Sequence, residues 1–246
     1  MRRMLLLPLL ALGLVSAGLC AETTQEKGLA IASEADRRDS GFEDFTADMT
    51  MILRNRQGDQ SVRAIRSRTL EVKNDGDKSL AIFDEPADVK GTAFLSYTHA
   101  TQPDDQWLYL PALKRVKRIS SSNKSGPFMG SEFAYEDISS QELAKYTYNY
   151  LRDENFDGQD CFVVERRPTD DYSGYTKQRV WVDKQHYRPL KIEFYDRKDS
   201  LLKTLTNHGY QQYVQQYWRP DEMRMINHQT GKTTTLIWKN YRFRTG

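Results

Sequence analysis

Apolar side chains recur at every second position along much of the chain. From Phe45 to Leu53 they alternate with polar side chains, which is the pattern of a strand with one buried and one solvated face. Residues 61–73 repeat the pattern after a short polar turn, so the two segments predict a long hairpin. The two-residue period resumes in the C-terminal half, where it predicts continuous strands over 201–213 and 217–228, among others.

Two segments have the character of helices instead. Residues 22–38 carry a weak apolar stripe that includes Ile31 and Ala35, and we predict a helix there. Residues 131–140 predict a short second helix with Ser131 as its N-cap, after a loop rich in glycine and serine.

The order of these elements indicates the fold class. Strand–helix–strand alternation is absent from the pattern, which argues against a parallel sheet. The sequence predicts a mainly β chain of the α+β class, with a single antiparallel sheet of about eleven strands. A sheet of this size must curl, close or split, and a curled sheet leaves a concave apolar face. We expect one domain over residues 22–246, because no repeat or low-complexity linker divides them.

The first 21 residues have the layout of a secretory signal peptide. Arg2 and Arg3 precede an apolar run over 4–15, and small residues follow up to Ala21. The apolar run is too short for a membrane-spanning helix with flanks of its own. We therefore predict export and a mature protein that begins near Glu22.

Removal of this segment changes the charge balance. It takes away two of the 36 basic residues and none of the 34 acidic ones, so the mature protein is neutral. We expect no nucleic-acid partner, because phosphate backbones demand a basic excess. Of the two cysteines, Cys161 alone remains after cleavage, which excludes an internal disulfide and metal centres built on cysteine clusters.

The residue types that could carry chemistry form no catalytic or metal-binding pattern. The four histidines lack partners at ligand spacing, and the sequence contains no phosphate-binding loop or nucleophile elbow. Cys161 lies in an apolar strand, where a structural thiol is expected. Glu132, Glu136 and Asp137 could form a general acid–base pair, but acids at the start of a helix account for the same residues. We expect no cofactor, no metal and no enzymatic activity.

A basic run separates the two halves of the chain. Its charged members are Lys114, Arg115, Lys117 and Arg118. Alternation places charge on both faces of this segment, which suits the edge of a sheet. A solvated edge and a contact with anionic headgroups or an acidic partner both remain open.

Motifs between residues 83 and 138 form a dense series. They are FDEP at 83–86, VKGTAFL at 89–95, DQWLYLPALKRV at 105–116, FMGSEF at 128–133 and YEDI at 135–138. On these motifs the chain resembles the outer-membrane lipoprotein-sorting protein family, a branch of the LolA/LolB-like proteins. The flanking hairpins are compatible with this family along nearly the whole mature chain.

The resemblance implies a fold and a function. The fold is an unclosed half-barrel, a curled antiparallel sheet around helices that act as a lid or plug. The function is that of a periplasmic carrier, which binds the acyl chains of a lipoprotein or lipid in an apolar cavity and transfers them between the inner and outer membranes. Proteins of this branch accompany exporters of the RND type, so an inner-membrane RND-type transporter is the expected partner of a monomeric carrier. The alternative is a lipid- or peptide-sensing adaptor that regulates a membrane partner without transferring cargo.

The apolar members of the matched region are the candidate ligand contacts, and we expect 128–138 to be a mobile lid. The candidates for the cavity and lid are Leu80, Ile82, Phe94, Leu95, Trp107, Leu108, Tyr109, Phe128, Met129, Phe133 and Tyr135. A carrier fits the physics of the cargo, because exposing an acyl chain to water costs about 0.8 kcal/mol per CH₂ group.

Overall fold

The computed structural model describes residues 22–246, so the predicted signal peptide (1–21) lies outside the described residues. Fifteen strands are assigned within this range. Thirteen of them form one sheet: β1 (Asp44–Arg54), β2 (Gln60–Leu70), β3 (Lys78–Glu85), β4 (Ala93–Tyr97), β5 (Asp105–Leu110), β6 (Arg115–Ile119), β7 (Tyr146–Phe156), β8 (Gln159–Pro168), β9 (Lys177–Asp183), β10 (Pro189–Tyr195), β11 (Leu201–His208), β14 (Glu222–Asn227) and β15 (Thr233–Phe243). The other two, β12 (Gln211–Tyr213) and β13 (Tyr217–Arg219), form a separate small hairpin.

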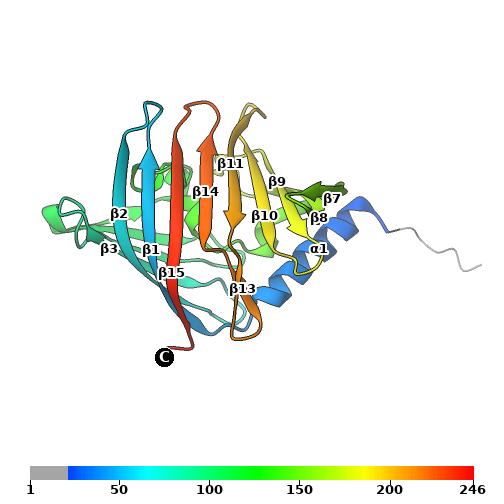
Figure 1. Ribbon diagram of the computed structural model, residues 1–246, viewed down its shortest axis with the longest axis horizontal. Helices are drawn as coiled ribbons and strands as arrows, with labels where there is room; N and C mark the ends of the chain where they lie inside the picture. The colour runs from blue at the N-terminus through cyan, green and yellow to red at the C-terminus, as the bar shows by residue number, and fades with distance from the viewer. Residues whose placement is uncertain (1–21) are drawn as a thin grey trace, which may run out of the picture.

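The large sheet is antiparallel and unclosed. Its strand order is β6-β5-β4-β3-β2-β1-β15-β14-β11-β10-β9-β8-β7, so β6 and β7 are its two edges. The sheet curls so that β3 and β7 lie toward opposite sides of the view (Figure 1). The predicted fold class is confirmed, with somewhat more strands than expected.

Two predicted strands are each divided in the structure. The segment 201–213 breaks at Gly209, whose φ of +64° is a conformation that favours glycine. The segment 217–228 breaks at Pro220, which has no backbone N–H to continue a ladder. Turn chemistry therefore overrides the two-residue period at both positions and releases the β12–β13 hairpin from the sheet.

The predicted N-terminal helix is confirmed as α1 (Thr24–Asp39). Thr23 and Glu26 form a capping box, in which each side chain accepts a hydrogen bond from the other residue's backbone N–H. The helix packs against β7 at the end of the sheet (Figure 1). Gly28 permits this close approach, because a Cβ atom there would lie 2.8 Å from the backbone nitrogen of Tyr150.

The buried core lies on the concave face. Met49 and Met51 on β1, Ile65 on β2 and Phe83 on β3 belong to one cluster, and each is at most 5% exposed. The alternation predicted for the first strand is therefore confirmed.

Residues 126–138, which we call the plug, fill the part of the concave face formed by β3 to β5. The ring of Phe128 lies 5.1 Å from that of Phe94 and 6.1 Å from that of Phe83, between ring centroids. Phe128 and Phe133 are 0% and 1% exposed. The plug therefore completes the core on this side of the molecule.

Within the plug, the prediction of a helix over 131–140 was wrong in its extent. The helix is the single turn α2 (Tyr135–Ile138), and its N-cap is Ala134 rather than Ser131. The hydroxyl of Ser131 accepts a hydrogen bond from the N–H of Phe133 at 3.2 Å, so it closes a local turn upstream of the helix.

Buried polar contacts tie the plug to the opposite strands. Lys203 Nζ on β11 donates to Asp137 Oδ2 at 2.6 Å and to the carbonyl oxygen of Glu132 at 2.8 Å. The side chains of Lys203 and Asp137 are each 5% exposed. Asn227 Nδ2 on β14 donates to Glu132 Oε2 at 2.6 Å, and the Tyr175 hydroxyl donates to Asp137 Oδ1 at 2.9 Å. These contacts join the plug to β11, β14 and Tyr175 in this structure, and the mobility of residues 128–138 stays a prediction.

Candidate functional site

A cavity of about 1070 Å³ opens between α1, the concave face of the sheet and the end of the plug. This volume is at the upper end of the range for small-molecule sites. Its deep wall is apolar, with side chains from α1, β8, β9, β14 and β15. They include Ile31, Ala32, Ala35, Val164, Val180, Val182, Met223 and Trp238.

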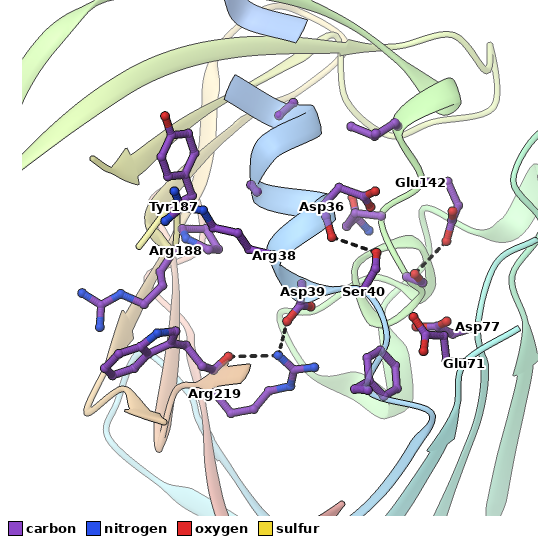
Figure 2. A pocket seen from close by; sticks show the side chains of 18 of the residues that line it. Asp36, Arg38, Asp39, Ser40, Glu71, Asp77, Glu142, Tyr187, Arg188 and Arg219 are labelled. Atoms are coloured by element: carbon purple, nitrogen blue, oxygen red, sulfur yellow. Dashed lines mark hydrogen bonds and ion pairs between the residues drawn. The ribbon is translucent and has the colours of Figure 1, made fainter. Parts of the chain in front are cut away.

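Carboxylates converge on one side of the cavity mouth. Figure 2 shows Asp36 on α1, Glu71 and Asp77 from the β2–β3 connection, and Glu142 just after the plug. Burial raises the pKa of Asp77 to about 7, and repulsion from Glu142 and Glu71 adds to the shift. Burial likewise raises the pKa of Glu142 and of Asp36.

Arginines on the other side of the mouth already have acidic partners. Arg219 pairs with Asp39 (Figure 2), and Arg188 Nε donates to Asp183 Oδ2 at 2.8 Å. The Arg188 guanidinium carbon also lies 4.6 Å from the ring centroid of Trp218. On this side of the mouth, the arginine charges are therefore balanced by carboxylates, and Arg188 packs on an aromatic ring.

Three solved structures resemble this fold over most of their length. The first is an outer membrane lipoprotein-sorting protein domain from Vibrio parahaemolyticus, 64% identical with a TM-score of 0.89, over 90% of this chain and 94% of that one. The second is a DUF1329 family protein from Desulfovibrio piger, 32% identical with a TM-score of 0.87, over 91% and 95%. The third is a LolA superfamily protein from Nitrosomonas europaea, 23% identical with a TM-score of 0.71, over 89% and 94%.

The chain belongs to the outer-membrane lipoprotein-sorting protein family. A family model described as "uncharacterized protein" also matches residues 75–246. No curated protein sequence matches the chain. The resemblance seen in the motifs of residues 83–138 is thus confirmed, and the half-barrel of this sorting-family protein has the LolA-like fold.

The sequence-predicted ligand contacts separate into two groups in this sorting-family protein. One group belongs to the core that the plug completes: Phe94, Leu108, Phe128, Met129, Phe133 and Tyr135. The other alternates with it on the convex face of β3, β4 and β5: Leu80, Ile82, Leu95, Trp107 and Tyr109. Neither group lines the 1070 Å³ cavity. Contact of these residues with a ligand stays a prediction.

The basic run lies where the sequence placed it, at an edge. β6 is the first strand of the sheet order, and its charged side chains are exposed. Lys114, with a φ of +47°, ends the short turn between β5 and β6. Leu113 at this turn and Val116 on the strand are 68% and 59% exposed.

Sequence reasoning missed the wall of the cavity. Val164, Val180 and Val182 lie on β8 and β9 and line the cavity, although each is at most 7% exposed, and the two-residue period gave no sign of a cavity beside them. The available signal was the spacing of Ile31 and Ala35, one helical turn apart on the face of α1 that meets the cavity.

Cys161 is the one cysteine among the described residues, and its thiol is free and buried. Cys161 is 0% exposed, as the apolar strand predicted, and burial raises its thiol pKa to about 11. Within residues 22–246, no cluster of His, Cys, Asp or Glu could hold a metal ion. No helix in the same range is both long and apolar enough to cross a bilayer.

Proposed function

We propose that this protein is a periplasmic carrier that binds acyl chains of a lipoprotein or lipid in the cavity beside α1. The observation that carries the proposal is the cavity itself. It has a volume of about 1070 Å³, apolar side chains along one wall and a polar mouth, and it lies in a fold whose family is named for lipoprotein sorting. An acyl chain placed there leaves water, which stabilises it by about 0.8 kcal/mol per CH₂ group.

The division of the concave face supports this proposal. The plug fills the β3–β5 side with aromatic side chains, whereas the cavity lies where α1 packs beside β7 and β8. The carrier would move between inner and outer membranes and receive cargo beside an RND-type transporter, as the sequence resemblance implies.

Transfer between vesicles tests the carrier directly. Donor vesicles that hold fluorescent NBD-phosphatidylethanolamine and a quencher are mixed with unlabelled acceptors, with and without the mature protein. We expect the protein to accelerate dequenching in proportion to its concentration. Lipid binding without any acceleration would instead support the adaptor, and the absence of both would contradict the proposal.

A further inference from the structure

The convex face of the sheet carries an apolar patch near its β6 edge. The side chains that alternate with the core on β3, β4 and β5 share this face, and the register continues it onto β6. We call the following side chains the outer patch: Leu80, Ile82, Leu95, Trp107, Tyr109 and Val116. Tyr109 and Val116, which are opposite each other, are 37% and 59% exposed, and the other four are half-buried.

The outer patch differs from the same face of the neighbouring strands. Arg66 and Arg68 on β2 are opposite Ile82 and Leu80, and Asp48 on β1 is opposite Arg66. A solvated sheet face is expected to be polar in this way. The main contacts of β4 and β5 are with their neighbours in the sheet, and α1 packs at the opposite end of it (Figure 1). Contiguous apolar surface of this kind often marks a site for a protein or a membrane.

The aromatic members give the outer patch the character of a membrane interface. The ring of Trp107 lies 5.4 Å from that of Tyr97 on the same face, between ring centroids, at an interplanar angle of 79°. Lys78 Nζ lies 4.6 Å from the Tyr97 ring centroid. Trp and Tyr combine an apolar ring with a polar group and concentrate at the headgroup level of bilayers. A lysine beside them can lay its stem on the apolar surface and keep its ammonium group among headgroups.

The strand that borders the outer patch is basic. Residues 109–119 contain no acid and four basic side chains: Lys114, Arg115, Lys117 and Arg118. All four are exposed, and within residues 22–246 only Arg118 among them forms an ion pair, with Asp105. The turn before β6 adds Leu113, which is 68% exposed. This edge therefore has an excess of positive charge next to exposed apolar side chains, which complements an anionic lipid surface.

We propose that the outer patch and β6 form a docking surface for an anionic phospholipid bilayer. The rings and aliphatic side chains enter the boundary between headgroups and acyl chains, and the basic side chains contact lipid phosphates. An acidic protein segment would account for the basic strand, whereas a bilayer accounts for the strand and the apolar patch together. The surface lies on the outside of the sheet, so docking requires no ligand in the cavity and goes beyond the proposed function.

Flotation with vesicles tests the docking surface. The mature protein is mixed with vesicles of phosphatidylcholine, with or without phosphatidylglycerol. We expect binding to the anionic vesicles that weakens in high salt, and much weaker binding to the neutral ones. Tyr109→Ser/Val116→Ser leaves every charge in place and removes apolar contact area, so it should lower the partition coefficient at least about tenfold.

A matched variant controls for the loss of exposed apolar side chains. Leu201→Ser/Val214→Ser changes two residues outside the outer patch that are 37% and 47% exposed, and it should bind vesicles as wild type does. Circular dichroism checks that both double variants keep the fold. If the folded patch variant binds as tightly as wild type, the outer patch is not a docking surface. If wild type does not bind anionic vesicles, the proposal of a bilayer is overturned and the surface fits an acidic protein instead.

Quenching of tryptophan fluorescence locates the contact. Trp181 is 2% exposed, and Trp218 and Trp238 line the cavity, so Trp107 is the tryptophan of the outer patch. Anionic vesicles that contain phosphatidylcholine with brominated acyl chains should quench part of the wild-type fluorescence. Trp107→Phe should lose most of that quenching and still float with the vesicles. Equal quenching of wild type and Trp107→Phe would show that the outer patch stays outside the bilayer.

Discussion

Asp77 shows how one residue can reveal a site that a strand pattern conceals. In the sequence it lies in a polar turn, Asp75-Gly76-Asp77, whose two aspartates are of one type and differ only in their surroundings. In the structure, Asp75 is hydrogen-bonded and has a pKa of about 2, whereas Asp77 faces other acids and has a pKa of about 7. Such a difference depends on tertiary neighbours and could not be predicted from the chain.

The first prediction concerns the pH dependence of stability at Asp77. Its folded-state pKa lies above its value of 3.8 in the unfolded chain, so ionisation disfavours the folded state. The cost is absent below about pH 4, grows as the pH rises toward 7, and is complete above it. Asp77→Asn should therefore raise the free energy of unfolding by about 1–3 kcal/mol at pH 8 and by little at pH 4.

Urea denaturation at both pH values measures this effect. Asp171→Asn serves as the control, since that acid is exposed. An equal gain at pH 4 and pH 8 would show that charge at Asp77 is not its cause.

Cys161 gives a second prediction. Its side chain is completely buried in a small cluster with Val163 and Trp181, outside the cavity lining. Cys161→Ala should lower the free energy of unfolding by roughly 1 kcal/mol through a small cavity and leave vesicle transfer unchanged. Loss of transfer with an intact fold would give this thiol a role that its burial does not suggest.

At the scale of elements, the plug carries the third prediction. The buried pair of Lys203 and Asp137 holds it to β11, and breaking such a pair leaves a buried charge that costs about 3–5 kcal/mol. Amide hydrogens of residues 128–138 should therefore exchange as slowly as those of the central strands, with or without lipid. Lys203→Met should accelerate their exchange more than that of β1.

If the amide hydrogens of the plug exchange fast in the wild-type protein and added lipid slows them, the segment is a mobile lid rather than a fixed plug. The sequence suggested such a lid because Gly126, Pro127 and Gly130 interrupt the pattern before Phe128. It could not show the partners that fix the plug, since Lys203 and Asn227 lie far along the chain.

The edge strand β6 carries the fourth prediction. Lys114 and Lys117 are exposed beside Leu113 and Val116, an arrangement suited to an anionic membrane surface. Because each basic residue near such a surface contributes about 1 kcal/mol, Lys114→Glu/Lys117→Glu should weaken sedimentation with phosphatidylglycerol vesicles at least about tenfold. Lys198→Glu, at an exposed turn, should bind as wild type does. Unchanged binding of the double variant would indicate a simply solvated edge.

For the whole molecule, local patterns predicted the architecture better than the site. The alternation of Met49 and Met51 and the helical stripe of α1 depend on short-range periods, so the sheet and helix were predictable. The cavity depends on how closely Gly28 lets α1 approach β7 and on how far the plug extends over the sheet. The approach of α1 and the extent of the plug both depend on contacts between residues far apart in the sequence. The motifs of residues 83–138 lie on the side of the concave face that the plug fills, and they give no information on the side that holds the cavity.

The central claim is that acyl chains occupy the cavity beside α1. Its most direct test is mass spectrometry of molecules extracted from natively purified protein, compared with two variants of one helix. Ala35 lines the cavity, whereas Ala30 is exposed and outside its lining. We predict acyl-chain-bearing molecules on wild type and Ala30→Trp and a marked loss on folded Ala35→Trp. Absence of such molecules from wild type, or equal amounts on both variants, would contradict the account.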